Sequence, residues 1–166
     1  GRCLINVTPD GQRTMCTFLG AANQLTVADI DVDLIGSSQI VYLEGYLFDP
    51  APARAAFEAA AAAAHAAGRK VAITLSDSFV VHRWRAELLA FIEASADIVF
   101  ANDAELLALF ETEDFDAAAK KLAAITEIAA VVDVVRCRYG YYCGISFKYD
   151  PCQLFLTIDV EERKVV

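Results

Sequence analysis

An asparagine and a glutamate three residues apart, Asn102 and Glu105, directly follow the apolar run "DIVFA". An amide and a carboxylate at the start of a helix could hold magnesium-bound water or a phosphate group, because Mg²⁺ prefers oxygen ligands and helix N-termini attract anions. The same spacing also makes a capping box, in which Asn102 accepts a backbone N–H and Glu105 reaches back. From spacing alone the capping box is favoured, because N-x-x-E is a short pattern.

Two other apolar runs end in polar or small residues, at 44–46 (Glu-Gly-Tyr) and at 76–78 (Ser-Asp-Ser). Ligands of open parallel sheets bind at the carboxyl ends of the strands, where loops and helix N-termini gather. Ser76 and Asp77 are therefore candidate cofactor-binding residues beside Asn102 and Glu105. Their simpler interpretation is a cap for the helical pattern that follows.

The remaining residues offer few other sites. His65 and His82 have no partner at metal-ligand spacing and are interpreted as helix-surface residues. After Gly68 only two glycines occur, so the C-terminal half lacks a glycine-rich phosphate loop, and no GxSxG element is present. The five cysteines are dispersed and form no CxxC pair, which predicts free, mostly buried thiols. We predict no catalytic residue.

Short apolar segments alternate with helical ones along most of the chain. We expect strands at 39–46, 70–76, 97–101 and 128–135, and helices at 51–67, 80–95, 102–111 and 114–125. Such alternation indicates right-handed βαβ crossovers, and strands without a polar side indicate a sheet covered on both faces. The fold class is therefore α/β, three-layered (α/β/α), with a mainly parallel sheet.

β-Hairpins are expected at both ends of this alternating region. The first consists of two β-prone runs around Pro9-Asp10-Gly11. In the second, "YYCGISFKY-DP-CQLFLTIDV", the helical period gives way to a period of two. A turn at Asp150-Pro151 would place the following residues opposite one another: Tyr149 and Cys152, Phe147 and Leu154, Ile145 and Leu156, Cys143 and Ile158.

Length and charge limit the class of protein. A chain of 166 residues with 57% hydrophobic content is consistent with one domain. The net charge of −9 argues against nucleic acid and anionic membrane surfaces as partners. No run of about 20 apolar residues is present, and the first residues do not resemble a signal peptide. We expect a soluble, cytoplasmic protein.

Several segments together resemble the PfkB/ribokinase family of sugar and adenosine kinases, over residues 1 to about 125. They are "GRCLINVTPDGQRTMCTFLGAA", "IVYLEGYLFDP", "AGRKVAITLSDSF" and "DIVFANDAELLALF". The resemblance implies a ribokinase-like (Rossmann-like) three-layer domain with a small β lid. It also implies transfer of the γ-phosphoryl group of ATP to a sugar or nucleoside hydroxyl with Mg²⁺. The family's N-x-x-E motif corresponds to Asn102 through Glu105, with Glu105 as the metal ligand, and this role can coexist with capping.

The family pattern also includes a glycine-rich D-T-x-G-A-G-D motif that supplies an anion hole and the aspartate base. Residues 126–166 contain Asp133, Asp150 and Asp159 without adjacent glycines, and the family's N-terminal substrate motif does not precede Gly1. Phosphoryl transfer depends on positioning and electrostatic stabilisation. We therefore expect a truncated, recombined or engineered kinase-derived scaffold without activity, in which 1–125 is kinase-like and 126–166 is a divergent β-rich tail of the same domain.

Two alternatives remain open. One is a phosphotransferase that uses Mg²⁺ and ATP and takes its missing parts from another chain. The other is an interaction module, such as a homodimer, that pairs through an exposed sheet edge or through the tyrosine-rich hairpin. That hairpin contains Tyr139, Tyr141, Tyr142 and Tyr149.

Overall fold

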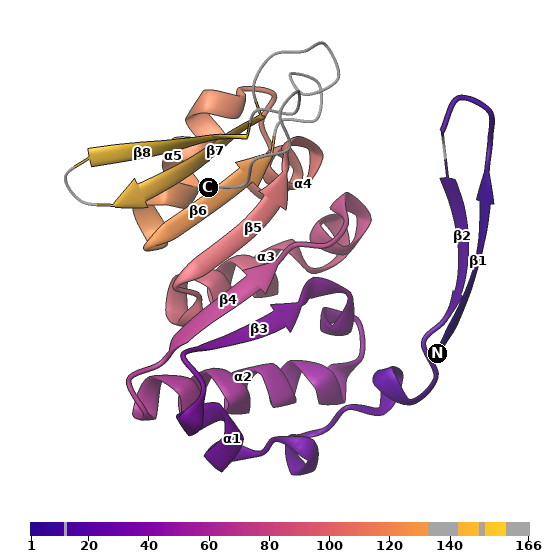
Figure 1. Cartoon of the computed structure of the whole chain (residues 1–166), viewed down its shortest axis with the longest axis vertical. Coiled ribbons are helices and arrows are strands. Elements are labelled where there is room, and N and C mark those ends of the chain that lie inside the picture. Colours follow the sequence, from indigo (N-terminus) through magenta and orange to yellow (C-terminus); the bar gives the residue numbers. More distant parts are fainter. Residues whose placement is uncertain (12, 133–142, 150–151, 159–166) are drawn as a thin grey trace.

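A four-stranded parallel sheet lies at the centre of the protein (Figure 1). The computed structural model describes residues 1–11, 13–132, 143–149 and 152–158. The strands of the sheet are β3 (Ile40–Glu44), β4 (Lys70–Thr74), β5 (Ile98–Asn102) and β6 (Ile128–Val132). Their order in the sheet is their order along the chain, and every pair is parallel. The predicted α/β class with a mainly parallel sheet is confirmed.

Helices connect the strands at the predicted places. They are α1 (Val32–Ser37), α2 (Ala51–Ala66), α3 (Ser78–Ser95), α4 (Asp103–Phe110) and α5 (Phe115–Ile125), with 3-10 turns η1 (Gly20–Gln24), η2 (Val27–Asp29) and η3 (Gly45–Phe48). The alanine-rich α2 begins after Pro50, and Gly68 follows its end with a φ of +67°. Alanine favours the helix, and glycine adopts the left-handed conformation that ends it.

The two faces of the sheet differ in how far the described residues cover them. Because the strand order equals the chain order, every right-handed crossover places its helix on the same face. The opposite face carries Tyr42 and Phe100, which are 57% and 40% exposed and whose ring centroids lie 6.3 Å apart. Among the described residues, the connecting helices therefore form one layer on the sheet.

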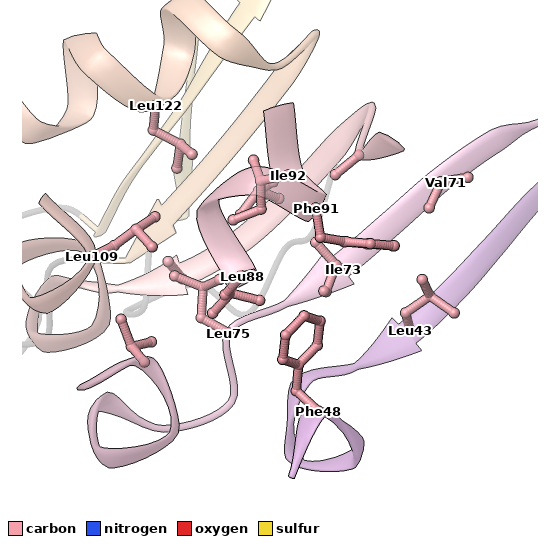
Figure 2. Close-up of a cluster of buried hydrophobic side chains, with 14 of the residues drawn as sticks. Leu43, Phe48, Val71, Ile73, Leu75, Leu88, Phe91, Ile92, Leu109 and Leu122 are labelled. Carbon is pink, nitrogen blue, oxygen red and sulfur yellow. The ribbon is translucent and has the colours of Figure 1, made fainter. Parts of the chain in front are cut away.

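The hydrophobic core lies between the sheet and the helices (Figure 2). Leu88 and Ile92 of α3 are fully buried and pack with Ile73 of β4 in the same cluster. Phe48, Phe57 and Phe91 form a triangle with ring centroids 6.1–6.3 Å apart. Burying a side chain of this size contributes about 1.5–3 kcal/mol, so this core fixes the strands and their ends relative to the helices.

The N-terminal hairpin is confirmed and stands apart from the sheet, on the side to which the arrowheads of β3 and β4 point (Figure 1). It consists of β1 (Arg2–Val7) and β2 (Arg13–Phe18), and Gly11 in the turn has a φ of +81°. Both of its faces are exposed, with Leu4 and Phe18 more than 70% accessible. Cys3 and Cys16 are consequently exposed free thiols, so the expectation of mostly buried cysteines is wrong for these two.

The C-terminal hairpin consists of β7 (Cys143–Tyr149) and β8 (Cys152–Ile158). Its register is the predicted one, with Tyr149 opposite Cys152 and Cys143 opposite Ile158. Its predicted turn, Asp150-Pro151, lies outside the described residues, as do Asp133, Tyr139, Tyr141, Tyr142 and Asp159. Within the described part of the chain, no helix is long and apolar enough to cross a membrane.

Candidate functional site

The predicted site residues come together at one edge of the sheet. Strands β3, β4 and β5 are parallel, with Glu44 paired to Thr74 and Thr74 paired to Phe100, so their carboxyl ends lie side by side. The loops that leave these ends carry Ser76 and Asp77 after β4 and the Asn102/Glu105 pair after β5. The topology thus assembles residues from two separate loops, Ser76 and Asp77 and the Asn102/Glu105 pair, at a single edge, as expected for parallel sheets.

The ends of β3 and β4 are locked together at Gly45 and Ser76. A Cβ atom at Gly45 would lie 2.4 Å from the carbonyl oxygen of Thr74 and 2.8 Å from that of Leu75, so no other residue fits without displacing backbone. Ser76 has a φ of +68°, which is unusual for a residue with a side chain, and its hydroxyl donates to the carboxylate of Glu44. Backbone strain of this kind clusters at functional sites.

Asp77 follows as the N-cap of α3. Its Oδ1 accepts the backbone N–H of Phe79 at 3.0 Å, and its Oδ2 accepts the hydroxyl of Tyr46 at 3.5 Å. The predicted capping role of Asp77 is therefore present. Ser76, by contrast, uses its hydroxyl within the protein, toward Glu44, rather than as a cap.

Asn102 and Glu105 form a complete capping box at the start of α4. Asn102 Oδ1 accepts the backbone N–H of Glu105 at 2.8 Å. In return, Glu105 Oε2 accepts the backbone N–H of Asn102 at 3.0 Å, and Glu105 Oε1 accepts Asn102 Nδ2 at 2.8 Å. Glu105 is only 5% exposed, so the box holds a carboxyl group in the protein interior.

The surroundings of Glu105 disfavour its negative charge. Burial raises the pKa of Glu105 above its usual value, the backbone hydrogen bond from Asn102 acts against this, and the charges of Asp77, Asp103 and Glu44 raise the pKa further. A bound cation would have the opposite effect, because it would stabilise the ionised carboxylate. This edge is electrostatically suited to a cation.

The donor set fits a particular kind of metal ion. No group of three or more His, Cys, Asp or Glu side chains that could hold a metal occurs among the residues that the structure describes. Mg²⁺ does not need such a group, since it keeps several waters and uses one or two carboxylates together with substrate phosphates. Each oxygen of Glu105 accepts one hydrogen bond and retains a second lone pair. The residues therefore fit a phosphate-bound Mg²⁺.

A cavity of ≈ 790 Å³ lies beside this edge, between the N-terminal hairpin and the loops after β3 and β4. Met15 and Thr17 of β2 line one part of it, and Tyr46, Asp49 and Asp77 line another. Its volume lies in the range of small-molecule sites. Sequence reasoning missed this cavity because its lining comes from segments that are far apart in the sequence, β2 and the loops after β3 and β4.

The two histidines lie on helices, as predicted. His65 is in the last turn of α2, where its Nε2 lies 3.1 Å from Oδ2 of Asp97. His82 is an exposed residue of α3. Neither belongs to a metal-binding group in the described part of the chain.

Comparisons with known proteins agree with this architecture. The family model described as pfkB family carbohydrate kinase matches residues 1–140, which extends past the expected boundary at residue 125. Similar solved structures include an adenosine kinase from Sinorhizobium meliloti, which is 43% identical with a TM-score of 0.85. That match covers 99% of this chain and 48% of the kinase.

Two further structures are similar. A probable sugar kinase protein from Rhizobium etli CFN 42 is 38% identical with a TM-score of 0.83, and the match covers 94% of this chain and 46% of that one. An E. coli protein described as a ribokinase II, solved with ATP and Mg²⁺, is 15% identical with a TM-score of 0.72, over 93% of this chain and 49% of that one. The last likeness shows the fold alone. No curated protein matches.

These relatives confirm the ribokinase-like fold expected from the sequence, and the chain spans about half of their length. The chain belongs to the PfkB family of carbohydrate kinases.

Proposed function

We propose that the chain carries the Mg²⁺–nucleotide edge and part of the acceptor cavity of an ATP-dependent kinase acting on a sugar or nucleoside hydroxyl. The observation that carries the proposal is the placement of Glu105. It is a buried carboxyl at the carboxyl end of β5, held by Asn102 and surrounded by acidic groups that a cation would neutralise.

In this proposal Glu105 holds Mg²⁺ together with the nucleotide phosphates, and Asn102 fixes the orientation of its carboxylate. Mg²⁺ would neutralise the charge of the phosphates during transfer, which depends mainly on positioning and electrostatics. Asp77 connects the two parts of the site, because it acts on Glu105 electrostatically and also lines the cavity. Ser76 contributes indirectly, by fixing the backbone before Asp77 through its bond to Glu44.

The relatives support this proposal. The 43% identical protein is named an adenosine kinase, and the E. coli structure of the same fold was solved with ATP and Mg²⁺. Since the chain spans about half of these proteins, we propose that the remaining groups for phosphoryl transfer come from further polypeptide, in the same chain or in another. Cytoplasmic location, absence of nucleic-acid partners and homodimerisation stay predictions.

The inactive, recombined or engineered scaffold expected from the sequence is the competing account, and it predicts no nucleotide binding. Calorimetric titration of the 166-residue chain with ATP, in Mg²⁺ and separately in EDTA, distinguishes the two. We expect saturable heat in Mg²⁺ that is lost or strongly reduced in EDTA. Absence of heat in both conditions would contradict the proposed function and favour the scaffold.

A further inference from the structure

Asp49 is an acidic residue of the cavity that lies outside the phosphate edge. It follows η3 directly, lines the cavity together with Tyr46 and Asp77, and has a side chain that is 34% exposed. A carboxylate repels phosphate and accepts hydrogen bonds from hydroxyl groups. Its chemistry therefore suits the uncharged acceptor substrate rather than the nucleotide phosphates.

The two oxygens of Asp49 have different environments. Oδ1 accepts the indole N–H of Trp84 at 2.6 Å and Nη1 of Arg83 at 2.8 Å. Oδ2 accepts no hydrogen bond within the described part of the chain. One oxygen thus fixes the carboxylate, and the other keeps its full capacity to accept from a ligand.

Arg54 in turn contacts Trp84, the residue whose indole N–H fixes the carboxylate of Asp49. The guanidinium carbon of Arg54 lies 4.0 Å from the centroid of the Trp84 ring. The same Arg54 donates through Nη1 to the carbonyl oxygens of Phe48 at 2.7 Å and of Asp49 at 3.1 Å. Both the backbone and the side chain of Asp49 are therefore held by the Arg54–Trp84 pair, which reduces the ordering cost of binding.

Trp84 itself occupies an unusual position in α3. Its φ of −123° and ψ of 26° are non-helical and mark a kink in the helix. A kink disrupts the regular backbone hydrogen bonds of a helix and has an identifiable cause. Here the indole N–H reaches Asp49 from the kinked position.

We infer that Asp49 is a specificity-determining residue of the acceptor cavity and that Trp84 is its positioning residue. Through Oδ2, Asp49 accepts a hydrogen bond from a hydroxyl of the substrate's sugar moiety. The inference rests on the proposed function, because it assigns the cavity to the acceptor. Met15 and Phe79 provide apolar wall on the same cavity, where the less polar part of such a substrate can pack.

The test measures discrimination between nucleosides that differ by one hydroxyl. The probes are adenosine and its 2′-, 3′- and 5′-deoxy analogues, titrated in saturating Mg²⁺ and AMP-PNP so that the nucleotide position is filled. Trp84 is the only tryptophan of the chain, so its fluorescence reports binding next to Asp49. The variants are Asp49→Asn, which keeps an oxygen for the indole N–H, and Asp116→Asn, an exposed acid of α5, as the control.

We expect the unmodified chain and Asp116→Asn to bind adenosine more tightly than at least one deoxy analogue, by about tenfold or more, the size of a hydrogen bond to a charged group. Asp49→Asn should remove this preference. Trp84→Phe, measured by calorimetry, should reduce it as well, whereas a purely structural loss would weaken all four nucleosides equally.

Three results would overturn the inference. One is an Asp49→Asn variant that still prefers adenosine over the deoxy analogue to the same extent. Another is equally weakened binding of all four nucleosides in Asp49→Asn and in Trp84→Phe. The third is absence of nucleoside binding by a chain that does bind Mg²⁺–ATP, which would leave the proposed nucleotide edge intact. If the chain binds neither ligand, the proposed function fails and the inference fails with it.

Discussion

The carboxylate of Glu105 accepts hydrogen bonds from both nitrogens of Asn102, the backbone nitrogen at 3.0 Å and Nδ2 at 2.8 Å. These bonds start α4 and also hold a buried carboxyl at the carboxyl end of β5. The two interpretations of the N-x-x-E spacing are thus compatible in one geometry. Capping orients the group, and its second lone pairs remain for a metal.

Asn102→Ala should destabilise the protein by about 1–2 kcal/mol, because it removes the cap of α4 and leaves the carboxyl of Glu105 without its side-chain donor. Urea unfolding measures this loss. Asn6→Ala, at an exposed position of β1, is the control and should change stability little. Equal stability of the two variants would contradict a structural role for the capping box.

The pH dependence of stability should carry the signature of Glu105. Its pKa in the folded protein is raised above the ordinary 4.5, mainly by burial, so the folded state holds the proton more tightly than the unfolded state. The resulting stabilisation is complete below the unfolded pKa and is lost as the pH rises through the folded pKa. Relative to Glu105→Gln, the unmodified protein should therefore lose stability as the pH rises from about 4.5.

Urea unfolding of both proteins from pH 4 to pH 8 measures this difference. Subtracting the two curves cancels the other carboxyl groups, which titrate in both proteins. A difference that does not change with pH, or one that grows in favour of the unmodified protein as the pH rises, would show that burial does not raise the pKa of Glu105.

Local patterns predicted much of this fold. The capping box, both hairpins and the helix that ends before Gly68 each depend on a few neighbouring residues, and all are present. The exposure of Tyr42 was not predictable in this way, because an aromatic residue in an apolar strand is typical of a buried face. Its exposure follows from strand order, which brings all crossovers to one face.

The site was predictable at the strand ends and unpredictable in the cavity. Asn102, Glu105, Ser76 and Asp77 follow apolar runs, and parallel pairing brings such ends together. The role of Asp49 depends on its hydrogen bond to Trp84, 35 residues later, and no local pattern indicates that contact.

Gly45→Ala should destabilise the protein by about 1–3 kcal/mol or more, because the added Cβ would meet the carbonyl oxygens of Thr74 and Leu75. Gly36→Ala is the matched control. There the Cβ would lie 3.7 Å from the Cβ of Ala67, an ordinary contact, and alanine is favoured in the helix by about 0.5–1 kcal/mol. If Gly45→Ala unfolds at the same urea concentration as the unmodified protein, the close approach at Gly45 is not present in solution.

Ser76 should tolerate glycine better than alanine, since both lose the hydroxyl bond to Glu44 but only glycine adopts a φ of +68° without strain. Glycine has more conformational freedom than alanine in the unfolded chain, which offsets part of this advantage. We therefore expect the Ser76→Gly variant to be more stable than the Ser76→Ala variant by about 0.5–1 kcal/mol. At Ser37, an exposed helical residue of α1, the order of the two variants should reverse. Thermal unfolding of the four variants tests this, and the same order at both positions would contradict a left-handed Ser76.

The central claim is that Glu105 holds the metal of a bound nucleotide, and Mg²⁺–ATP affinity of Glu105→Gln tests it most directly. Glutamine can still accept the backbone N–H of Asn102, so the capping role is largely kept while the charge is removed. Glu58→Gln, on the exposed side of α2, is the control. Calorimetry should show an unchanged Kd for the control and a Kd raised about tenfold or more for Glu105→Gln, with both variants folded. A Kd for folded Glu105→Gln equal to that of the unmodified protein would contradict the claim.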